Sequence, residues 1–296
     1  MKPLRISKIE FDAQHRHLNN RLLAFSLTKR GRRLVTQAIR KNVSLSMSSS
    51  LKAINSAARI RFADLFCINL RAFALEKSID EVFFVTLIVR KHAVPLSKAA
   101  AFNVAACKEV AGQFLEDLDY IGLIEAAYYY RIPFIGGSQQ PFVSWHSHAL
   151  VWSASHKELS DRRRLFNRAH HAFVPGKRAA HFQMIAMESV SSYVRYMSKS
   201  LLKEYTAYPK MRTVVDPRTG ELIKQPTGKW RNRKRSIRPT NLVRAMSAMG
   251  DRSLEHLTFA GGTGVGLRRA LLKASRDSLE KDTATRASRR RALLFA

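Results

Sequence analysis

The sequence predicts an α+β protein in which one antiparallel sheet carries helices packed on one face. Segments of strand length, rich in β-branched and aromatic residues, lie at 81–89, 123–132, 143–152 and 181–187. Amphipathic helical patterns separate or follow them, at 97–118, 159–173 and 190–205. The predicted order is therefore β-α-β-β-α-β-α, with a Gly136-Gly137-Ser138 turn between the second and third strands.

Both flanks of this predicted sheet domain are basic. We expect a helical N-terminal region at 1–78, the sheet domain at 79–206 and a basic C-terminal region at 207–296. In the last region, Asp216-Pro-Arg-Thr-Gly220 predicts a hairpin turn. The glycine-rich segment 261–266 lacks the Lys-Ser/Thr pair of a phosphate-binding P-loop, so we expect a flexible connection there.

The charge of the chain indicates a polyanionic partner. Lysine and arginine number 52 against 22 acidic residues, which gives a formal net charge of +30 over 296 residues. Such an excess repels itself in the folded state and is typical of proteins that bind nucleic acid. The sequence has no apolar run of membrane-span length, no signal-peptide core and only two cysteines. These features predict a cytoplasmic protein with no membrane partner and no disulfide framework.

The third predicted strand holds two histidines at a spacing that suits metal binding. In Val143-Ser-Trp-His-Ser-His-Ala-Leu-Val-Trp152, the residues His146 and His148 lie two apart. Alternate side chains of a strand share a face, so both imidazoles point the same way, about 7 Å apart along the strand. With a third ligand nearby they form a metal-binding arrangement. Without one, they are polar residues on the open face of an amphipathic strand.

The last predicted helix carries a tyrosine and a lysine on one face. In Tyr193-Val-Arg-Tyr-Met-Ser-Lys199, the residues Tyr196 and Lys199 lie three apart, and Tyr193 lies one turn earlier. An apolar strand with Thr86, a His-x-His strand and a Tyr-x-x-Lys helix thus follow one another along the chain.

This ordered set resembles the HUH endonuclease superfamily, and specifically the rolling-circle replication initiators of plasmids and single-stranded DNA phages. Three segments correspond to the three family motifs: Phe83-Phe-Val-Thr-Leu-Ile88, Trp145-His-Ser-His-Ala-Leu-Val151 and Val194-Arg-Tyr-Met-Ser-Lys199. The resemblance covers about 80–205 and implies an RRM-like sheet. The chain departs from the family at Ser147, where the residue between the histidines is normally bulky and apolar.

The resemblance also implies a chemistry. The two histidines and a third polar side chain would hold Mg²⁺ or Mn²⁺, and Tyr196 would attack the scissile phosphate to form a 5′-phosphotyrosine. Lys199 would orient the phosphate or stabilise the developing charge. Two-tyrosine family members space their tyrosines four apart, whereas Tyr193 and Tyr196 are three apart. We therefore expect single-tyrosine chemistry with Tyr196, and we favour a packing role in the core for Tyr193 over a second catalytic role.

Strand register points to the third metal ligand. If the hairpin is centred near Gly136 and Gly137, Glu125 lies opposite 148–150 and shares a face with His148. Family members often carry an acidic ligand on this strand, which makes Glu125 the first choice. Gln183 and Glu188, near the end of the neighbouring strand, are the alternatives.

A cationic run in the C-terminal region is a candidate surface for DNA. It combines an aromatic side chain with positive charge, as single-strand binding proteins do, although a solvated charge run has the same pattern. The residues that we expect to bind DNA are Trp230, Arg231, Arg233, Lys234 and Arg235, with Thr86 near the site.

The sequence thus predicts a rolling-circle initiator that nicks and rejoins origin DNA. Neither an ATPase motif nor a nucleotide cofactor site is visible, so a host helicase and a host DNA polymerase are the expected partners, in the bacterial cytoplasm. Two alternatives stay open. A single-tyrosine transposase of the same superfamily shares the chemistry, and a non-catalytic nucleic-acid-binding protein on an RRM-like frame shares the fold.

Overall fold

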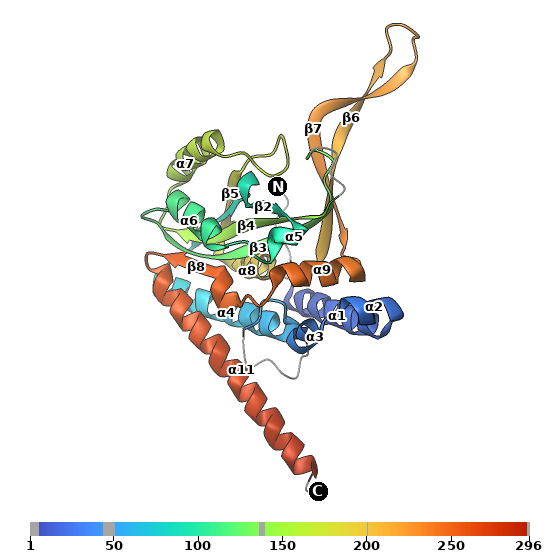
Figure 1. Ribbon diagram of the computed structural model, residues 1–296. Helices are drawn as coiled ribbons and strands as arrows, with labels where there is room; N and C mark the ends of the chain where they lie inside the picture. The colour runs from blue at the N-terminus through green and yellow to red at the C-terminus, as the bar shows by residue number, and fades with distance from the viewer. Residues whose placement is uncertain (1–5, 44–50, 136–139, 200, 295–296) are drawn as a thin grey trace.

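One sheet runs through the middle of the molecule in the computed structural model, which describes residues 6–43, 51–135, 140–199 and 201–294 (Figure 1). The strands are β1 Glu81–Leu87, β2 Ala93–Pro95, β3 Asp119–Arg131, β4 Phe142–Trp152, β5 Ala180–Ala186, β6 Lys203–Val215, β7 Leu222–Ser236 and β8 Thr258–Gly261. They lie in the order β5-β1-β4-β3-β6-β7, and β2 pairs with β4 while β8 pairs with β3. All of these pairings are antiparallel except that of β3 with β6.

Helices surround this sheet. They are α1 Lys8–Leu27, α2 Lys29–Leu34, α3 Gln37–Val43, α4 Ser56–Glu76, α5 Leu96–Ala99, α6 Ala105–Phe114, α7 His156–Ala169, α8 Val190–Ser198, α9 Pro239–Met249, α10 Leu254–Leu257 and α11 Gly264–Leu294, with short 3-10 helices η1 Arg90–His92 and η2 Met187–Ser189. The predicted helical character of the N-terminal region and the α+β class are both confirmed. None of the described helices has the length and apolar character that crossing a lipid bilayer requires.

The four predicted strands all form, but two predicted helices are shorter than expected. The segment predicted as one helix at 97–118 contains α5 and α6 instead, and between them the Asn103 side chain accepts a hydrogen bond from the Ala105 amide, which competes with a continuous helix. The helix predicted at 190–205 ends at Ser198, and the chain continues into β6.

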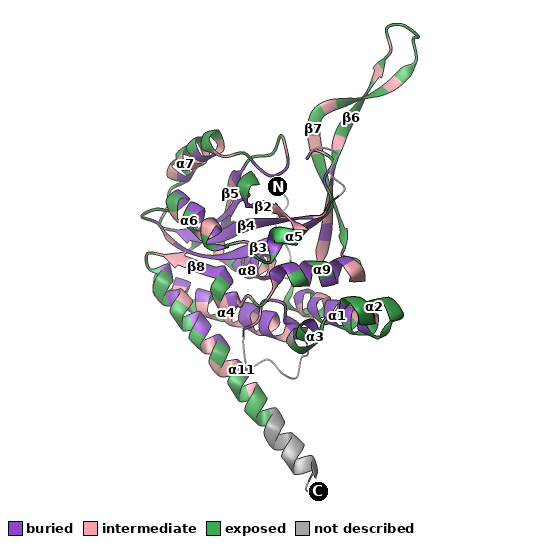
Figure 2. Cartoon of the chain, viewed as in Figure 1, coloured by how far each residue is buried: buried purple, intermediate pink, exposed green. Residues whose placement is uncertain are grey.

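Helices pack on both faces of the sheet, not on one face as predicted (Figure 1). On one face, the Ser147 hydroxyl of β4 donates a hydrogen bond to the Cys107 carbonyl of α6, at 3.3 Å. On the other face, the His148 ring lies 5.4 Å from the ring of Tyr196 on α8. Every residue of β4 is consequently buried (Figure 2). A small serine at position 147 is explained by its contact with the backbone of α6.

The C-terminal region contributes strands to the same sheet. The predicted boundary between residues 206 and 207 falls inside β6, and β8 pairs with β3 through Tyr120 and Gly261. The predicted hairpin turn is confirmed, since the Gly220 amide donates to the Asp216 carbonyl between β6 and β7. The glycine-rich segment 261–266 is not a loose connection but the turn from β8 into α11.

Gly264 allows α11 to approach β3, and this contact can be tested. A Cβ atom added at Gly264 would lie 1.9 Å from the carbonyl oxygen of Tyr120, so backbone would have to move. We expect Gly264→Ala to lower the free energy of unfolding by about 1–3 kcal/mol, measured by urea denaturation.

The matched control is Gly266→Ala in the same helix. A Cβ atom there has nothing within 4 Å, and alanine is favoured over glycine in helices by about 0.5–1 kcal/mol. This variant should be as stable as the wild type or more so. Equal stability of the two variants would contradict the close approach.

Candidate metal centre

The pairing of β3 with β4 brings a carboxylate beside two imidazoles. Glu125 lies opposite His146 in the antiparallel register, and His148 follows two residues along the same face. The predicted partner of Glu125 at 148–150 is therefore wrong by two residues, because the hairpin is centred about one residue earlier than expected. A register shift of two residues leaves every side chain on the same face of the sheet, so Glu125 and His148 remain neighbours as expected. The predicted Gly136-Gly137-Ser138 turn lies outside the described residues.

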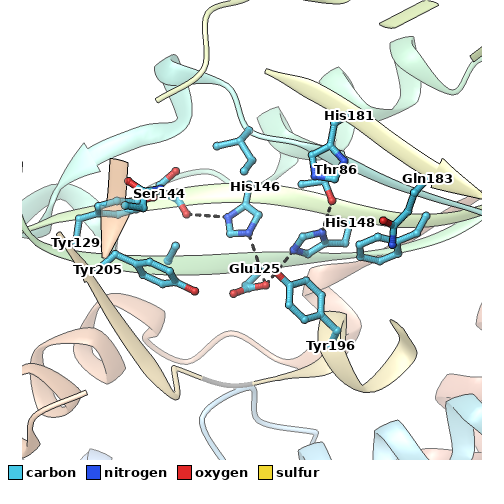
Figure 3. A pocket seen from close by; sticks show the side chains of 14 residues that line it. Thr86, Glu125, Tyr129, Ser144, His146, His148, His181, Gln183, Tyr196 and Tyr205 are labelled. Atoms are coloured by element: carbon cyan, nitrogen blue, oxygen red, sulfur yellow. Dashed lines mark hydrogen bonds and ion pairs between the residues drawn. The ribbon is translucent and has the colours of Figure 1, made fainter. Parts of the chain in front are cut away.

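The donor atoms of Glu125, His146 and His148 lie close enough to share one cation (Figure 3). One oxygen or nitrogen atom from each side chain lies within 4.8 Å of the other two. The Nε2 atoms of His148 and His146 are 3.0 Å and 3.6 Å from the same atom, Glu125 Oε2. All three side chains are buried, so this group could hold a metal ion away from bulk water.

Further hydrogen bonds orient both imidazoles. His146 Nδ1 lies 3.1 Å from the Ser144 carbonyl oxygen, which only accepts, so this nitrogen carries a proton. Nε2 of His146 is thus directed at Glu125. Two imidazole nitrogens and one carboxylate oxygen that face a common point form a donor set that fits a divalent metal. His148 Nδ1 is held by the Thr86 hydroxyl at 2.9 Å.

The charge states of these groups also suit a metal. Burial alone would raise the pKa of Glu125, but Lys199 and His146 outweigh it and hold that pKa well below its usual range. Burial lowers the pKa of His148 to about 3, against the opposing hydrogen bond to Glu125. A carboxylate that stays ionised and an imidazole that stays neutral are the forms that bind metal ions.

Tyr196 lies beside this group, as predicted from its position in the sequence. Its ring is 5.4 Å from the ring of His148, and Figure 3 shows its hydroxyl directed toward Glu125. Burial raises the pKa of the Tyr196 phenol, and the nearby Glu125 carboxylate raises it further. The phenol is therefore neutral until positive charge is brought near its oxygen.

Tyr193 occupies a different environment. It is 2% exposed, and its hydroxyl accepts a hydrogen bond from Gln183 Nε2 at 2.6 Å. Gln183, one alternative metal ligand, lines the pocket but is engaged with Tyr193. Glu188, the other alternative, belongs to η2 and not to the metal-binding group. The geometry thus brings Tyr196 to the site and supports a packing role for Tyr193.

Lys199 reaches the site from the end of α8, not from its face. The helix ends at Ser198, and Lys199 has extended backbone angles of φ −60° and ψ 147°. Its ammonium forms an ion pair with Glu125 and lies 3.6 Å from the centre of the Tyr196 ring. Arg59 of α4 holds this end of the helix by donating to the carbonyl oxygens of Ser198 and Lys199, at 2.9 Å and 3.1 Å.

The pocket around these residues contains two groups that the sequence argument missed, Tyr205 and Asn232. It has a volume of about 220 Å³ and is also lined by Tyr129, one of a run of three tyrosines that could stack bases or face the core. The rings of Tyr129 and Tyr205 stack with their centres 5.3 Å apart. Tyr205 was assigned to a helix, whereas it lies in β6 and pairs with Tyr129 of β3. The alternation of polar and apolar residues after Lys203 was the available signal for a strand.

The residues predicted to bind DNA are distributed over different environments. Thr86 is 4% exposed and is engaged with His148, so it orients that imidazole instead of meeting a large partner. Trp230 packs edge-on against Phe134 at 5.3 Å. The remaining residues lie on β7, where Arg235 forms an ion pair with the buried Glu204. Four are exposed at the surface: Arg231, Arg233, Lys234 and Arg235.

Metal binding by this group can be measured directly. We expect the wild-type protein to bind Mn²⁺ in isothermal titration calorimetry, and His146→Ala to weaken binding by about 100-fold or more, because one of three protein ligands is lost. The control His17→Ala removes an exposed histidine of α1 and should leave the affinity unchanged. Equal affinities in the wild type and His146→Ala would place the ion elsewhere.

Comparisons with known proteins return no relative. No protein-family model matches the chain, and neither a curated protein nor a solved structure matches it. The functional interpretation of the chain therefore rests on the residues of its own site.

Proposed function

We propose that the protein is a rolling-circle replication initiator, a metal-dependent endonuclease that nicks and rejoins origin DNA. One observation carries the proposal: the phenol of Tyr196 and the metal-binding group of Glu125, His146 and His148 line the same pocket. The net charge of +30 supports a nucleic acid as the substrate.

The arrangement of the sheet supports the same family of endonucleases. The strands that were predicted from sequence lie in the spatial order β5-β1-β4-β3, with α6 between β1 and β3 in the chain and α7 between β4 and β5. This order supports the RRM-like arrangement that the resemblance implies. The two histidines lie on β4, a central strand, and the tyrosine lies on the helix that follows β5. These are the positions that the resemblance to HUH endonucleases implies.

In the proposed reaction, the Tyr196 oxygen attacks the scissile phosphorus and forms a phosphotyrosine bond. The phenol gives up its proton, the bond from phosphorus to the 3′ oxygen of the preceding nucleotide breaks, and that oxygen takes up one proton to become a 3′-hydroxyl. The reverse attack by a 3′-hydroxyl rejoins the strand and releases Tyr196. A divalent cation held by Glu125, His146 and His148 would supply Lewis-acid polarisation of the phosphate.

Lys199 provides positive charge where the nucleophile needs it. Burial and Glu125 both raise the pKa of Tyr196, so the phenolate requires a compensating cation. The Lys199 ammonium, 3.6 Å from the centre of the Tyr196 ring, stabilises the phenolate. Arg59 keeps this lysine in place by binding the backbone at the end of α8.

The proposal implies partners for the remaining steps of replication. The exposed 3′-hydroxyl would prime a host DNA polymerase, and a host helicase would separate the strands, in the cytoplasm of a bacterial cell. Mg²⁺ or Mn²⁺ would be the metal. A transposase of the same superfamily would form the same adduct and differ in the DNA ends that it cuts.

The nucleophile can be identified by the covalent adduct. Supercoiled DNA of the replicon that encodes the protein, incubated with Mn²⁺, should become nicked and carry the protein at a 5′ end. Tyr196→Phe should lower adduct formation by about 1000-fold or more, since the attacking oxygen is removed.

Two controls make this test specific. Tyr193→Phe should retain the adduct, because Tyr193 is buried beside Gln183. Tyr129→Phe and Tyr205→Phe examine the other two tyrosines of the pocket. An adduct that persists in Tyr196→Phe would assign the attack to another residue, and metal-independent DNA binding without any adduct would indicate a non-catalytic protein.

The role of Lys199 predicts a separation of chemistry from metal binding. We expect Lys199→Gln to slow adduct formation by about 100-fold, because charge stabilisation of the phenolate is lost. The affinity for Mn²⁺ should be retained, because the ammonium is not a metal ligand. Loss of Mn²⁺ binding in this variant, measured by calorimetry, would show that Lys199 maintains the structure of the site instead.

A further inference from the structure

A two-stranded arm extends from the body of the protein. It comprises residues 207–233, the outer parts of β6 and β7 and the turn between them, and it projects away from the sheet (Figure 1). Strand β6 pairs with β3 only through Glu204, Tyr205 and Thr206, and further out it pairs with β7 alone. The nine residues of β6 beyond Thr206 span about 30 Å at the usual rise of a strand. This length is close to one turn of a DNA duplex, about 34 Å.

The arm is strongly basic and its charges are available. Residues 207–233 contain seven lysines and arginines against two acidic residues. The cations are Lys210, Arg212, Arg218, Lys224, Lys229, Arg231 and Arg233. All seven are exposed (Figure 2), and none of them forms an ion pair with any residue in the described part of the chain.

At the base of the arm, in contrast to its outer part, the arginines form ion pairs. There, Arg235 and Arg238 form ion pairs with the buried Glu204 and also lie over the ring of Tyr130, at 4.4 Å and 4.9 Å. These two arginines anchor the arm to the body. The cations further out therefore serve no comparable structural purpose, and folding does not account for them.

The residue types of the arm favour a duplex over a single strand. Proteins that hold single strands stack bases on aromatic side chains. The two aromatic residues of the arm, Tyr208 and Trp230, lie near its base, and Trp230 packs against Phe134. Residues 210–229, the outer part of the arm, contain no phenylalanine, tyrosine or tryptophan and so offer no stacking platform. A two-stranded ribbon has the width that the major groove of B-DNA admits, and lysine and arginine side chains on it can reach the phosphates.

The arm begins at the candidate active site. Tyr205 of β6 and Asn232 of β7 line the pocket that contains Tyr196, and from there both strands run outward. DNA bound along the arm would therefore lead directly to the pocket.

We propose that this arm binds the phosphate backbone of duplex DNA that flanks the cleavage site. The statement that the bound duplex flanks the cleavage site rests on the proposed function. The statement that the arm binds a duplex does not. In this arrangement the arm holds the double-stranded part of the origin while the pocket receives the strand that is cut.

The test compares duplex and single-stranded DNA in a binding assay without cleavage. The variant combines Arg212→Gln, Lys224→Gln and Lys229→Gln. Fluorescence anisotropy with a labelled duplex of two helical turns, and with one of its strands, is recorded over a range of salt concentrations in EDTA. We expect duplex affinity to fall about tenfold or more and the salt dependence to weaken by about 2–3 released counterions, with single-strand affinity unchanged.

A matched control removes the same charge from another part of the protein. Arg269→Gln, Lys273→Gln and Lys281→Gln lie on α11, which runs away from the arm (Figure 1). This control should keep the duplex affinity, and both variants should unfold at the temperature of the wild type. The inference is overturned if the arm variant binds duplex like the wild type, if single-strand affinity falls equally, or if the control loses as much. Since no cleavage is measured, absence of a covalent adduct in the wild type would remove the proposed function and leave this result intact.

Discussion

The ionised carboxylate of Glu125 is the interaction on which the site depends. An isolated charge in the protein interior is unstable unless it is paired and hydrogen-bonded. Glu125 is 7% exposed, and it is stabilised by Lys199 and by the two histidines. These partners come from β4 and from the end of α8, so the register of β3 with β4 and the length of α8 must both be correct for the charge to be accommodated.

The N-terminal helices take part in the same arrangement. Arg59 of α4 is buried and donates hydrogen bonds to backbone carbonyls at the end of α8, 139 and 140 residues away in the chain. It thereby stops the helix where Lys199 can turn back toward Glu125. A segment whose sequence indicates only a basic helical region thus supports the structure around Tyr196 and Lys199.

The parts of the site that follow local rules were predictable from sequence. The shared face of His146 and His148 depends only on the two-residue period of a strand, and Glu125 remained on that face because its register was wrong by an even number. The end of α8 was not predictable in this way, and for the place of Tyr205 the local signal is limited to the short alternation after Lys203. The first depends on Arg59, and the second on pairing with Tyr129, both distant in sequence. The helical spacing of residues 190–205 is a local pattern, and these long-range contacts override it.

The distribution of charge separates binding from chemistry. The excess of +30 cannot lie in the pocket, where the Glu125 carboxylate balances the Lys199 ammonium and His148 stays neutral. Cations on the surface, such as those of the arm, attract a polyanion through long-range forces that salt screens. Inside the pocket, fewer charges act at short range and are shielded from water, so each has a larger effect on Tyr196. In the proposed initiator, affinity for DNA therefore arises mainly outside the pocket, while the balanced charges within it leave room for one divalent cation and one phosphate.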